Sequence, residues 1–147
     1  MKYNEALQTL GKNFDPFLHI LKNEIIDETE WFFVVPSRAP YVKNHLLVIP
    51  KRKVYLLKDL KENEKIEMFK LLEKWTTKLH KIHPDINLLL RDGLVWWKTG
   101  KSVNHLHFHL IPDCPIWAEW QLNSIERKWY DETEYEIIIK EIKDNFC

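Results

Sequence analysis

The chain has 147 residues, the usual length of one domain with one substantial hydrophobic core. Its 22 lysines and arginines balance 22 aspartates and glutamates, so no net positive charge favours general binding to nucleic acid. We find no secretory signal, no apolar stretch that would span a membrane, and no metal-ligand or disulfide pattern at Cys114 and Cys147. We therefore expect a single domain over residues 1–147, located in the cytoplasm.

The first elements predicted along the chain are a short helix and two strands. Residues 4–10 fit a helix with Asn4 as its N-cap and Gly11 as its stop. The aromatic and β-branched residues from Trp31 to Val35 predict a strand. A second strand is predicted from Leu46 to Ile49, closed by Pro50.

An amphipathic helix is predicted between Glu64 and Ile82, ending before Pro84. Its apolar positions recur at spacings of three and four residues: Met68, Leu72, Trp75, Leu79 and Ile82. Two more strands are expected over Ile86–Leu90 and His105–Ile111. Strands around one long helix indicate an α+β domain with a mainly antiparallel sheet.

A terminal helix is predicted to begin at Thr133, which together with Glu136 resembles a capping box. Four apolar residues would line one side of it: Ile138, Ile139, Ile142 and Phe146. The β-branched run over residues 137–139 would also suit a strand.

Three histidines alternate with apolar residues in the segment "GKSVNHLHFHLIP", residues 100–112. In a strand, His105, His107 and His109 would share one face, while the apolar residues between them would face the core. Upstream, Gly100 is followed by Lys101 and Ser102, a cation and a hydroxyl that can bind a phosphate.

Three interpretations of the histidine row are open. The rings can lie on a solvated face, with water or backbone as partners. They can hold a metal ion, although alternate strand residues are about 6.6 Å apart, so only two neighbours would share one ion. They can also perform nucleophilic catalysis, in which a neutral central imidazole attacks while its neighbours orient it. The third interpretation is favoured by the apolar opposite face, Leu106, Phe108 and Leu110, which anchors the strand in a core, together with the upstream groups that can bind a phosphate.

The segment "GKSVNHLHFHLIP" resembles the signature of the histidine triad (HIT) family of nucleotide hydrolases and transferases. Upstream, "PSRAPYVKNHLLVIPKRKVYLLKDL" (Pro36 to Leu60) is similar to the family segment in which a histidine opens a strand ending in "VIPK". Between them, "LLLRDG" sits where the family has the strand before its phosphate loop. Two ordered matches are more specific than one. The resemblance implies an antiparallel sheet with a helix packed on it, and a homodimer whose sheets join.

The resemblance also implies a role for each histidine. His107 matches the family's nucleophile, which attacks the α-phosphorus of a nucleotide derivative and forms a nucleotidyl-histidine that water hydrolyses. His105 matches the residue that orients the nucleophile, and His109 matches the one that contacts the phosphate and assists the leaving group. His45 matches the upstream histidine that lines the same pocket. Ser102 matches the phosphate-binding hydroxyl. No cofactor is implied.

The chain departs from the family pattern at several positions. Ser37 stands where an acidic or amide residue often holds the ribose, Asn44 replaces the usual glycine, and Arg91 replaces an amide side chain. Lys101 takes the place of a glutamine. Four tryptophans near the motif can stack on a base or cover a dimer surface: Trp96, Trp97, Trp117 and Trp120. A metal-dependent hydrolase and a non-catalytic nucleotide-binding module stay as alternatives to the nucleotide hydrolase or transferase.

Overall fold

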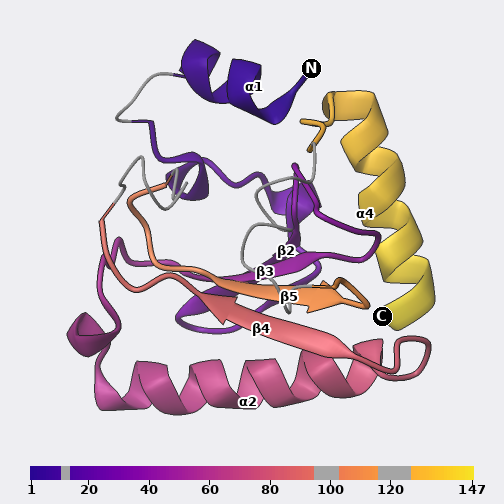
Figure 1. Cartoon of the computed structure of the whole chain (residues 1–147). Helices are drawn as coiled ribbons and strands as arrows, with labels where there is room; N and C mark the ends of the chain where they lie inside the picture. The colour runs from indigo at the N-terminus through magenta and orange to yellow at the C-terminus, as the bar shows by residue number, and fades with distance from the viewer. Residues whose placement is uncertain (11–13, 95–102, 116–126) are drawn as a thin grey trace.

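The computed structural model describes residues 1–10, 14–94, 103–115 and 127–147. Within this part, five strands form one antiparallel sheet in the order β1-β2-β3-β5-β4 (Figure 1). The main elements are α1 (Tyr3–Leu10), β1 (Asp27–Glu28), β2 (Phe32–Pro36), β3 (Leu46–Pro50), α2 (Glu62–Leu79), β4 (Ile86–Leu90), β5 (Phe108–Pro112) and α4 (Glu132–Phe146). Short 3-10 helices occupy Pro16–Leu18, Lys22–Glu24 and Leu57–Asp59. The predicted α+β class with an antiparallel sheet is confirmed.

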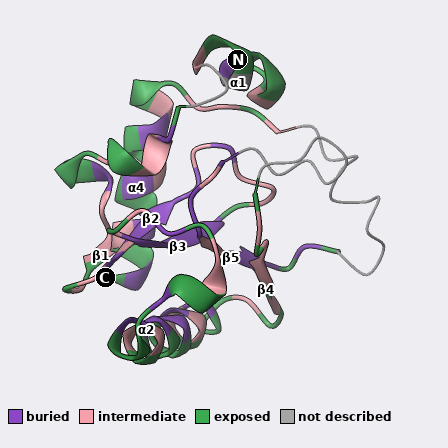
Figure 2. Cartoon of the chain, turned by 90° about the vertical axis from the view of Figure 1, so that its left-hand side faces the viewer, coloured by how far each residue is buried: buried purple, intermediate pink, exposed green. Residues whose placement is uncertain are grey.

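The main hydrophobic core lies between α2 and one face of the sheet. Figure 2 shows the side of α2 toward the sheet as buried and the opposite side as exposed. Trp75 is deeply buried in this core, and its indole N–H donates to Oδ2 of Asp27 at 2.8 Å, so its one polar atom is satisfied. The buried members include Phe32, Val34, Leu46, Val48, Met68, Leu72, Trp75, Leu79, Leu106 and Leu110. The other face of the sheet is covered by the N-terminal residues, with α1 beyond them (Figure 1).

Helix α2 ends at Leu79, three residues before the predicted end. The amide of His80 donates to the Thr76 carbonyl at 2.9 Å, and the chain then tightens into a turn in which Ile82 donates to the carbonyl of Leu79 at 3.2 Å. The side chain of Ile82 is therefore 58% exposed, and its predicted place on the apolar stripe is wrong. The other four predicted core positions of this helix are buried.

The helix caps also differ from the prediction. Helix α1 begins at Tyr3, so Asn4 lies inside it and does not cap it. Helix α4 is capped by Asp131 and Glu134, whose side chains each accept the other's backbone N–H, and not by the pair at 133 and 136. The run at residues 137–139 is helical, as one of the two alternatives proposed. Among the described residues, no helix combines the length and the apolar composition that crossing a membrane requires.

Strand β5 begins at Phe108, three residues later than predicted, so His105 and His107 precede it. The ladder between β3 and β5 places Val48 opposite Phe108, and the same register would place Pro50 opposite Leu106. Proline has no amide hydrogen and cannot extend the ladder there. The Leu106 amide instead donates to the Val54 carbonyl at 2.6 Å. The segment before β5 is consequently free to turn its histidines to different partners.

Candidate active site

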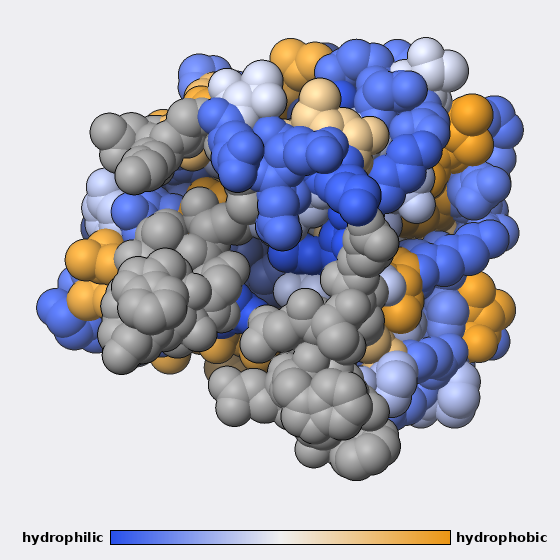
Figure 3. Space-filling view, turned by 45° about the horizontal axis from the view of Figure 1, so that its top comes forward, coloured by the Kyte–Doolittle hydropathy of each residue, from blue (hydrophilic) through white to orange (hydrophobic). Residues whose placement is uncertain are grey.

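His45 and His109 meet on the sheet face that points away from α2. Strands β3 and β5 are neighbours, and their register places Leu47 opposite His109, one residue after the start of β3. Nε2 of His45 lies 2.8 Å from Nδ1 of His109, and the rings of His107 and His109 lie 4.7 Å apart. Figure 3 brings this side of the molecule forward and shows a hollow with hydrophilic side chains along its upper edge.

Hydrogen bonds determine which nitrogens of His45 and His109 carry protons. The backbone amide of Tyr41 donates to Nδ1 of His45 at 3.2 Å, so in the neutral ring the proton is on Nε2. This Nε2–H donates to Nδ1 of His109. The proton of neutral His109 is therefore on its own Nε2, and that ring offers an N–H donor on its far side.

Burial keeps both of these rings neutral. Burial first, and then the positive charge of Arg127 and the nearby His107, together lower the pKa of His45 to about 3. The pKa of His109 also falls well below its usual value, through burial first and then through the charges of His107, His45, Arg127 and Arg91. At pH 7 the pair consequently acts as a chain of neutral donors.

His107 has the opposite tautomer. Its Nδ1 lies 2.7 Å from the carbonyl oxygen of His105, which can only accept, so Nδ1 carries the proton. The neutral ring therefore has its lone pair on Nε2. The edge of the Phe17 ring packs against His107 with centroids 4.8 Å apart and restricts how the imidazole can rotate. A lone pair beside the N–H donor of His109 suits attack on an electrophile that carries anionic oxygens.

His105 is fully buried, and both of its ring nitrogens bind protein oxygens. Nδ1 lies 2.8 Å from Oδ2 of Asp15, and Nε2 lies 2.8 Å from the carbonyl oxygen of Pro50. The expectation that all three imidazoles form one row along a strand is therefore wrong for His105. Its backbone carbonyl, and not its ring, reaches His107.

The structure places two of the predicted nucleotide-binding residues beside the histidines. Ser37 is buried, and its amide donates to the carbonyl of His45 at 2.8 Å. Arg91 directly follows β4, and its charge acts on His109. The other predicted residues near the phosphate loop, Lys101, Ser102, Trp96 and Trp97, lie outside the described residues, as do Trp117 and Trp120.

Asn44, which replaces the expected glycine, has a φ of 64°. Asparagine adopts this left-handed conformation more readily than other non-glycine residues, because its side chain bonds locally. Its amide nitrogen lies 2.8 Å from Nε2 of His83, whose Nδ1 lies 2.7 Å from Oδ2 of Asp113. The residue before His45 is thus held by its contact with His83, which Asp113 holds in turn, despite the substitution.

Several residues that the sequence did not single out complete the site. Tyr41 stacks on His45 with centroids 5.5 Å apart, and the guanidinium of Arg127 lies 4.2 Å from the Tyr41 ring centroid. Asp15 and Phe17 contact the rings of His105 and His107 from the N-terminal segment. No spacing rule links these residues to the motif, because Asp15 is 90 positions from His105.

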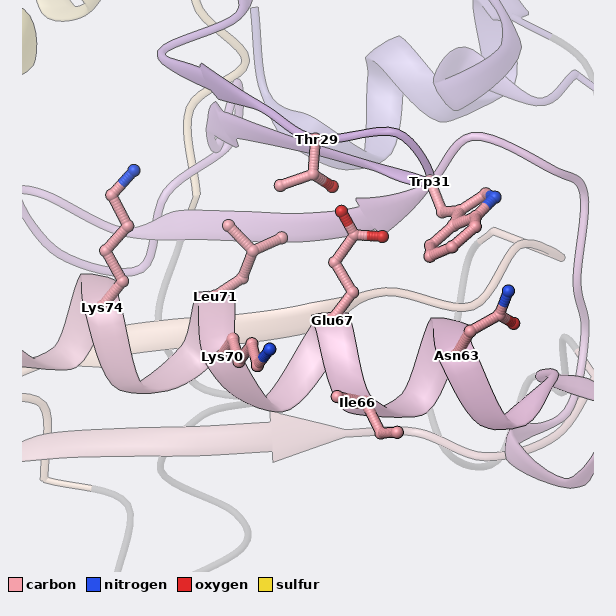
Figure 4. Close-up of a pocket in the computed structure, with 8 residues that line it drawn as sticks. All are labelled: Thr29, Trp31, Asn63, Ile66, Glu67, Lys70, Leu71 and Lys74. Carbon is pink, nitrogen blue, oxygen red and sulfur yellow. The ribbon is translucent and has the colours of Figure 1, made fainter.

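The described residues hold no metal-ligand group beside this site, and a pocket on another part of the molecule is separate from it. Among them, no group of three or more His, Cys, Asp or Glu side chains could hold a metal ion. A pocket of about 490 Å³ lies elsewhere, between α2 and the β1–β2 turn, and includes Thr29, Trp31 and Glu67 (Figure 4). Since α2 covers the opposite face of the sheet, this pocket does not belong to the histidine cluster.

Comparisons with known proteins agree with the geometry. A family model described as the HIT domain matches residues 20–115, which include all five strands and the four site histidines. Bis(5'-adenosyl)-triphosphatase of Dictyostelium discoideum is 32% identical over 101 residues, covering 67% of this chain and 65% of the relative. A relative of the same name from Saccharomyces cerevisiae is 28% identical over 129 residues, covering 83% of this chain. The chain spans 55% of that relative's length.

A solved structure shows the same fold. The hypothetical histidine triad nucleotide-binding protein of Sulfolobus tokodaii strain 7 superposes with a TM-score of 0.65 at 22% sequence identity. The superposition covers 89% of this chain and 91% of that one. At this level of identity the likeness establishes the arrangement of strands and helices.

Proposed function

Because the chain belongs to the HIT family, we propose that it is a nucleotide hydrolase or nucleotidyl transferase acting at the α-phosphate of a nucleotide derivative. The observation that carries this proposal is the 2.7 Å hydrogen bond between Nδ1 of His107 and the His105 carbonyl. It selects the tautomer with a lone pair on Nε2, which is the form of imidazole that can attack phosphorus.

In the proposed reaction, Nε2 of His107 attacks the α-phosphorus. A nitrogen–phosphorus bond forms as the bond from phosphorus to the leaving oxygen breaks, which gives a nucleotidyl-histidine. Water then attacks the same phosphorus, releases the nucleoside monophosphate and restores the imidazole. A transferase would use another nucleophile in place of that water.

His109 and His45 act in this scheme as neutral donors. The Nε2–H of His109 donates a hydrogen bond to a phosphoryl oxygen and stabilises charge that builds up during displacement. Because the pKa values of both rings are low, neither ring is an imidazolium at pH 7, and neither supplies a proton as a general acid in this scheme. A nucleoside phosphate leaving group departs as an anion, so it requires no proton from His109.

The nucleotide itself is held by groups around the histidines. We propose that Ser102 and Lys101 bind the phosphate, that Arg91 adds positive charge beside His109, and that Ser37 takes the ribose side next to His45. This chemistry requires no cofactor and no metal ion.

A kinetic assay with one variant tests the proposal. The name of the relatives supplies the first substrate, bis(5'-adenosyl) triphosphate. We expect His107→Ala to abolish turnover, because the attacking nitrogen is lost, and to retain binding of the nucleoside monophosphate. With a radiolabelled substrate, acid-quenched wild-type protein should carry the label, and the variant should not. Unchanged hydrolysis in His107→Ala would exclude the mechanism.

The controls separate the alternatives. His19 is exposed and lies outside the cluster, so His19→Ala should keep full activity. Loss of activity with a chelator, restored by zinc, would indicate the metal-dependent hydrolase. Nucleotide binding with no turnover of dinucleoside polyphosphates, phosphoramidates or nucleotide sugars would indicate a binding module.

We also propose that residues 1–147 form one HIT-like domain that dimerises and works in the cytoplasm. The amide of Trp129 donates to the carbonyl of Met1, which ties the N-terminus to the C-terminal segment, and Tyr135 Oη donates to the carbonyl of Pro36, which ties α4 to β2. Cys114 and Cys147 are free thiols, which suits a reducing compartment. Because positive and negative side chains balance, no net positive charge attracts nucleic acid or a membrane surface. We therefore propose a small nucleotide as the partner.

A further inference from the structure

We propose that Asp15 is a positioning residue of this site: its carboxylate holds the buried ring of His105 as an imidazolium and thereby fixes the carbonyl that sets the tautomer of His107. The role in turnover rests on the proposed function, whereas the protonation state of His105 can be measured without any substrate.

The protonation state follows from the two partners of the His105 ring. The carbonyl oxygen of Pro50, 2.8 Å from Nε2, can only accept, so Nε2 carries a proton. The carboxylate of Asp15, 2.8 Å from Nδ1, also accepts when ionised, so Nδ1 carries a proton as well. A neutral imidazole has only one N–H and cannot satisfy both oxygens.

The surroundings of Asp15 favour the ionised carboxyl. Nζ of Lys53 lies 3.3 Å from the same Oδ2 that faces His105, and Oδ1 accepts the amide N–H of Phe17 at 3.0 Å. A protonated carboxyl would have to place its hydrogen on Oδ2, directly beside this ammonium group. The pair is buried, and a buried imidazolium is stable only with such a partner and with its second N–H bonded.

The ion pair acts on His107 through the backbone. The His105 ring is bound on one side to the end of β3 and on the other to the N-terminal segment, so the residue cannot rotate without breaking one of these bonds. Its carbonyl therefore stays directed at Nδ1 of His107. If that carbonyl moved, the proton of neutral His107 could occupy Nε2, and the nucleophilic lone pair would be lost.

NMR of the free, full-length protein tests the first half of the proposal. Long-range proton–nitrogen spectra at pH 7 should show two protonated ring nitrogens for His105, and a proton on Nδ1 alone for His107. A neutral His105 ring in the wild-type protein would overturn the proposal. In Asp15→Asn the amide can donate to Nδ1, so His105 should become neutral. His19→Gln, at an exposed position outside the cluster, should leave the imidazolium in place.

Kinetics of the same variants test the second half. We expect Asp15→Asn to lower kcat about tenfold to a hundredfold, the usual cost of losing a partner that orients a functional histidine, with KM changed less than about threefold. Asp15→Glu should recover part of kcat, and His19→Gln should stay within about twofold of wild type. An unchanged kcat in Asp15→Asn would overturn the positioning role.

The experiments distinguish a variant that fails to fold from a wild-type protein that lacks the proposed activity. If Asp15→Asn does not fold, the wild-type spectrum and Asp15→Glu still decide the proposal. If the wild-type protein turns over no nucleotide, the proposed function fails, while the spectrum of His105 independently supports or refutes the ion pair.

Discussion

At the scale of single residues, fixed acceptors and donors decide what each imidazole can do. The Tyr41 amide assigns the proton of His45, His45 assigns that of His109, and the His105 carbonyl assigns that of His107. Three rings of the same chemical type thus take different roles. Burial adds to this by keeping His45 and His109 neutral.

The neutral, buried state of His45 predicts a pH-dependent stability. Its pKa is about 3 in the folded protein and about 6.5 when unfolded, so between these values only the unfolded chain binds the proton. The contribution of His45 to the free energy of unfolding has its full value above about pH 6.5 and decreases as pH falls towards 3. Between pH 7.5 and 5.5 the loss from His45 alone should be about 1.4 kcal/mol, measured by urea unfolding as the difference between wild type and His45→Gln.

The matched variants are His45→Gln and His19→Gln. His45→Gln cannot take up a proton, so its stability should vary less between the two pH values. His19 is exposed, and His19→Gln should keep the wild-type pH dependence. Identical pH dependence in wild type and His45→Gln would contradict the assignment.

At the scale of elements, the end of strand β3 and the end of helix α2 determine the geometry of the site. Pro50 ends the β3–β5 ladder, which releases His105 and His107 from the sheet, while His109 stays in β5. The end of α2 at Leu79 leads into the turn that contains His83, whose ring contacts Asn44 beside His45. Each end therefore connects the fold to a site histidine.

The end of α2 can be tested with two substitutions. Leu79 is fully buried, so Leu79→Ala should lower the free energy of unfolding by about 2–5 kcal/mol. Ile82 is mostly exposed beyond the helix, and Ile82→Ala should change it by less than about 0.5 kcal/mol. Urea denaturation measures both. Comparable losses would mean that the helix continues to residue 82.

At the scale of the whole molecule, the sheet has one long open edge. In the described part of the chain, β4 is the terminal strand of the sheet beside β5, and its central residue Leu88 is 50% exposed. On α2, Phe69 is 70% exposed. A long edge strand with exposed apolar side chains favours pairing with another strand, so the proposed dimer would join two sheets through β4.

Light scattering after gel filtration tests this dimer. The wild-type protein should have about twice the 17.9 kDa mass of one chain. Leu88→Lys should shift it towards the monomer, because a two-fold axis brings like charges to the same interface. Ile137→Lys on the exposed face of α4 is the matched control and should remain dimeric. A wild-type monomer at all concentrations would refute the proposal.

Local pattern was enough to predict the α+β class, β4 with its exact bounds, and the buried side of α2. Side-chain periodicity and the conformational limits of proline act over a few residues, so they are visible in one stretch of sequence. The ends of the helices were harder to predict from local sequence pattern. Competing caps such as Asp131 and Thr133 differ by little free energy, and tertiary contacts select between them.

By itself, the sequence determined that His105, His107 and His109 belong to one motif and that His45 joins them. The tertiary structure alone decided which ring turns inward, which nitrogen carries each proton, and that Asp15, Tyr41 and Arg127 surround them. The physical reason is that a hydrogen bond acts over about 3 Å in space, whatever the separation along the chain. The spacing of residues in the sequence shows which of them are neighbours in a strand. It does not show which distant oxygen accepts a hydrogen bond from a ring nitrogen.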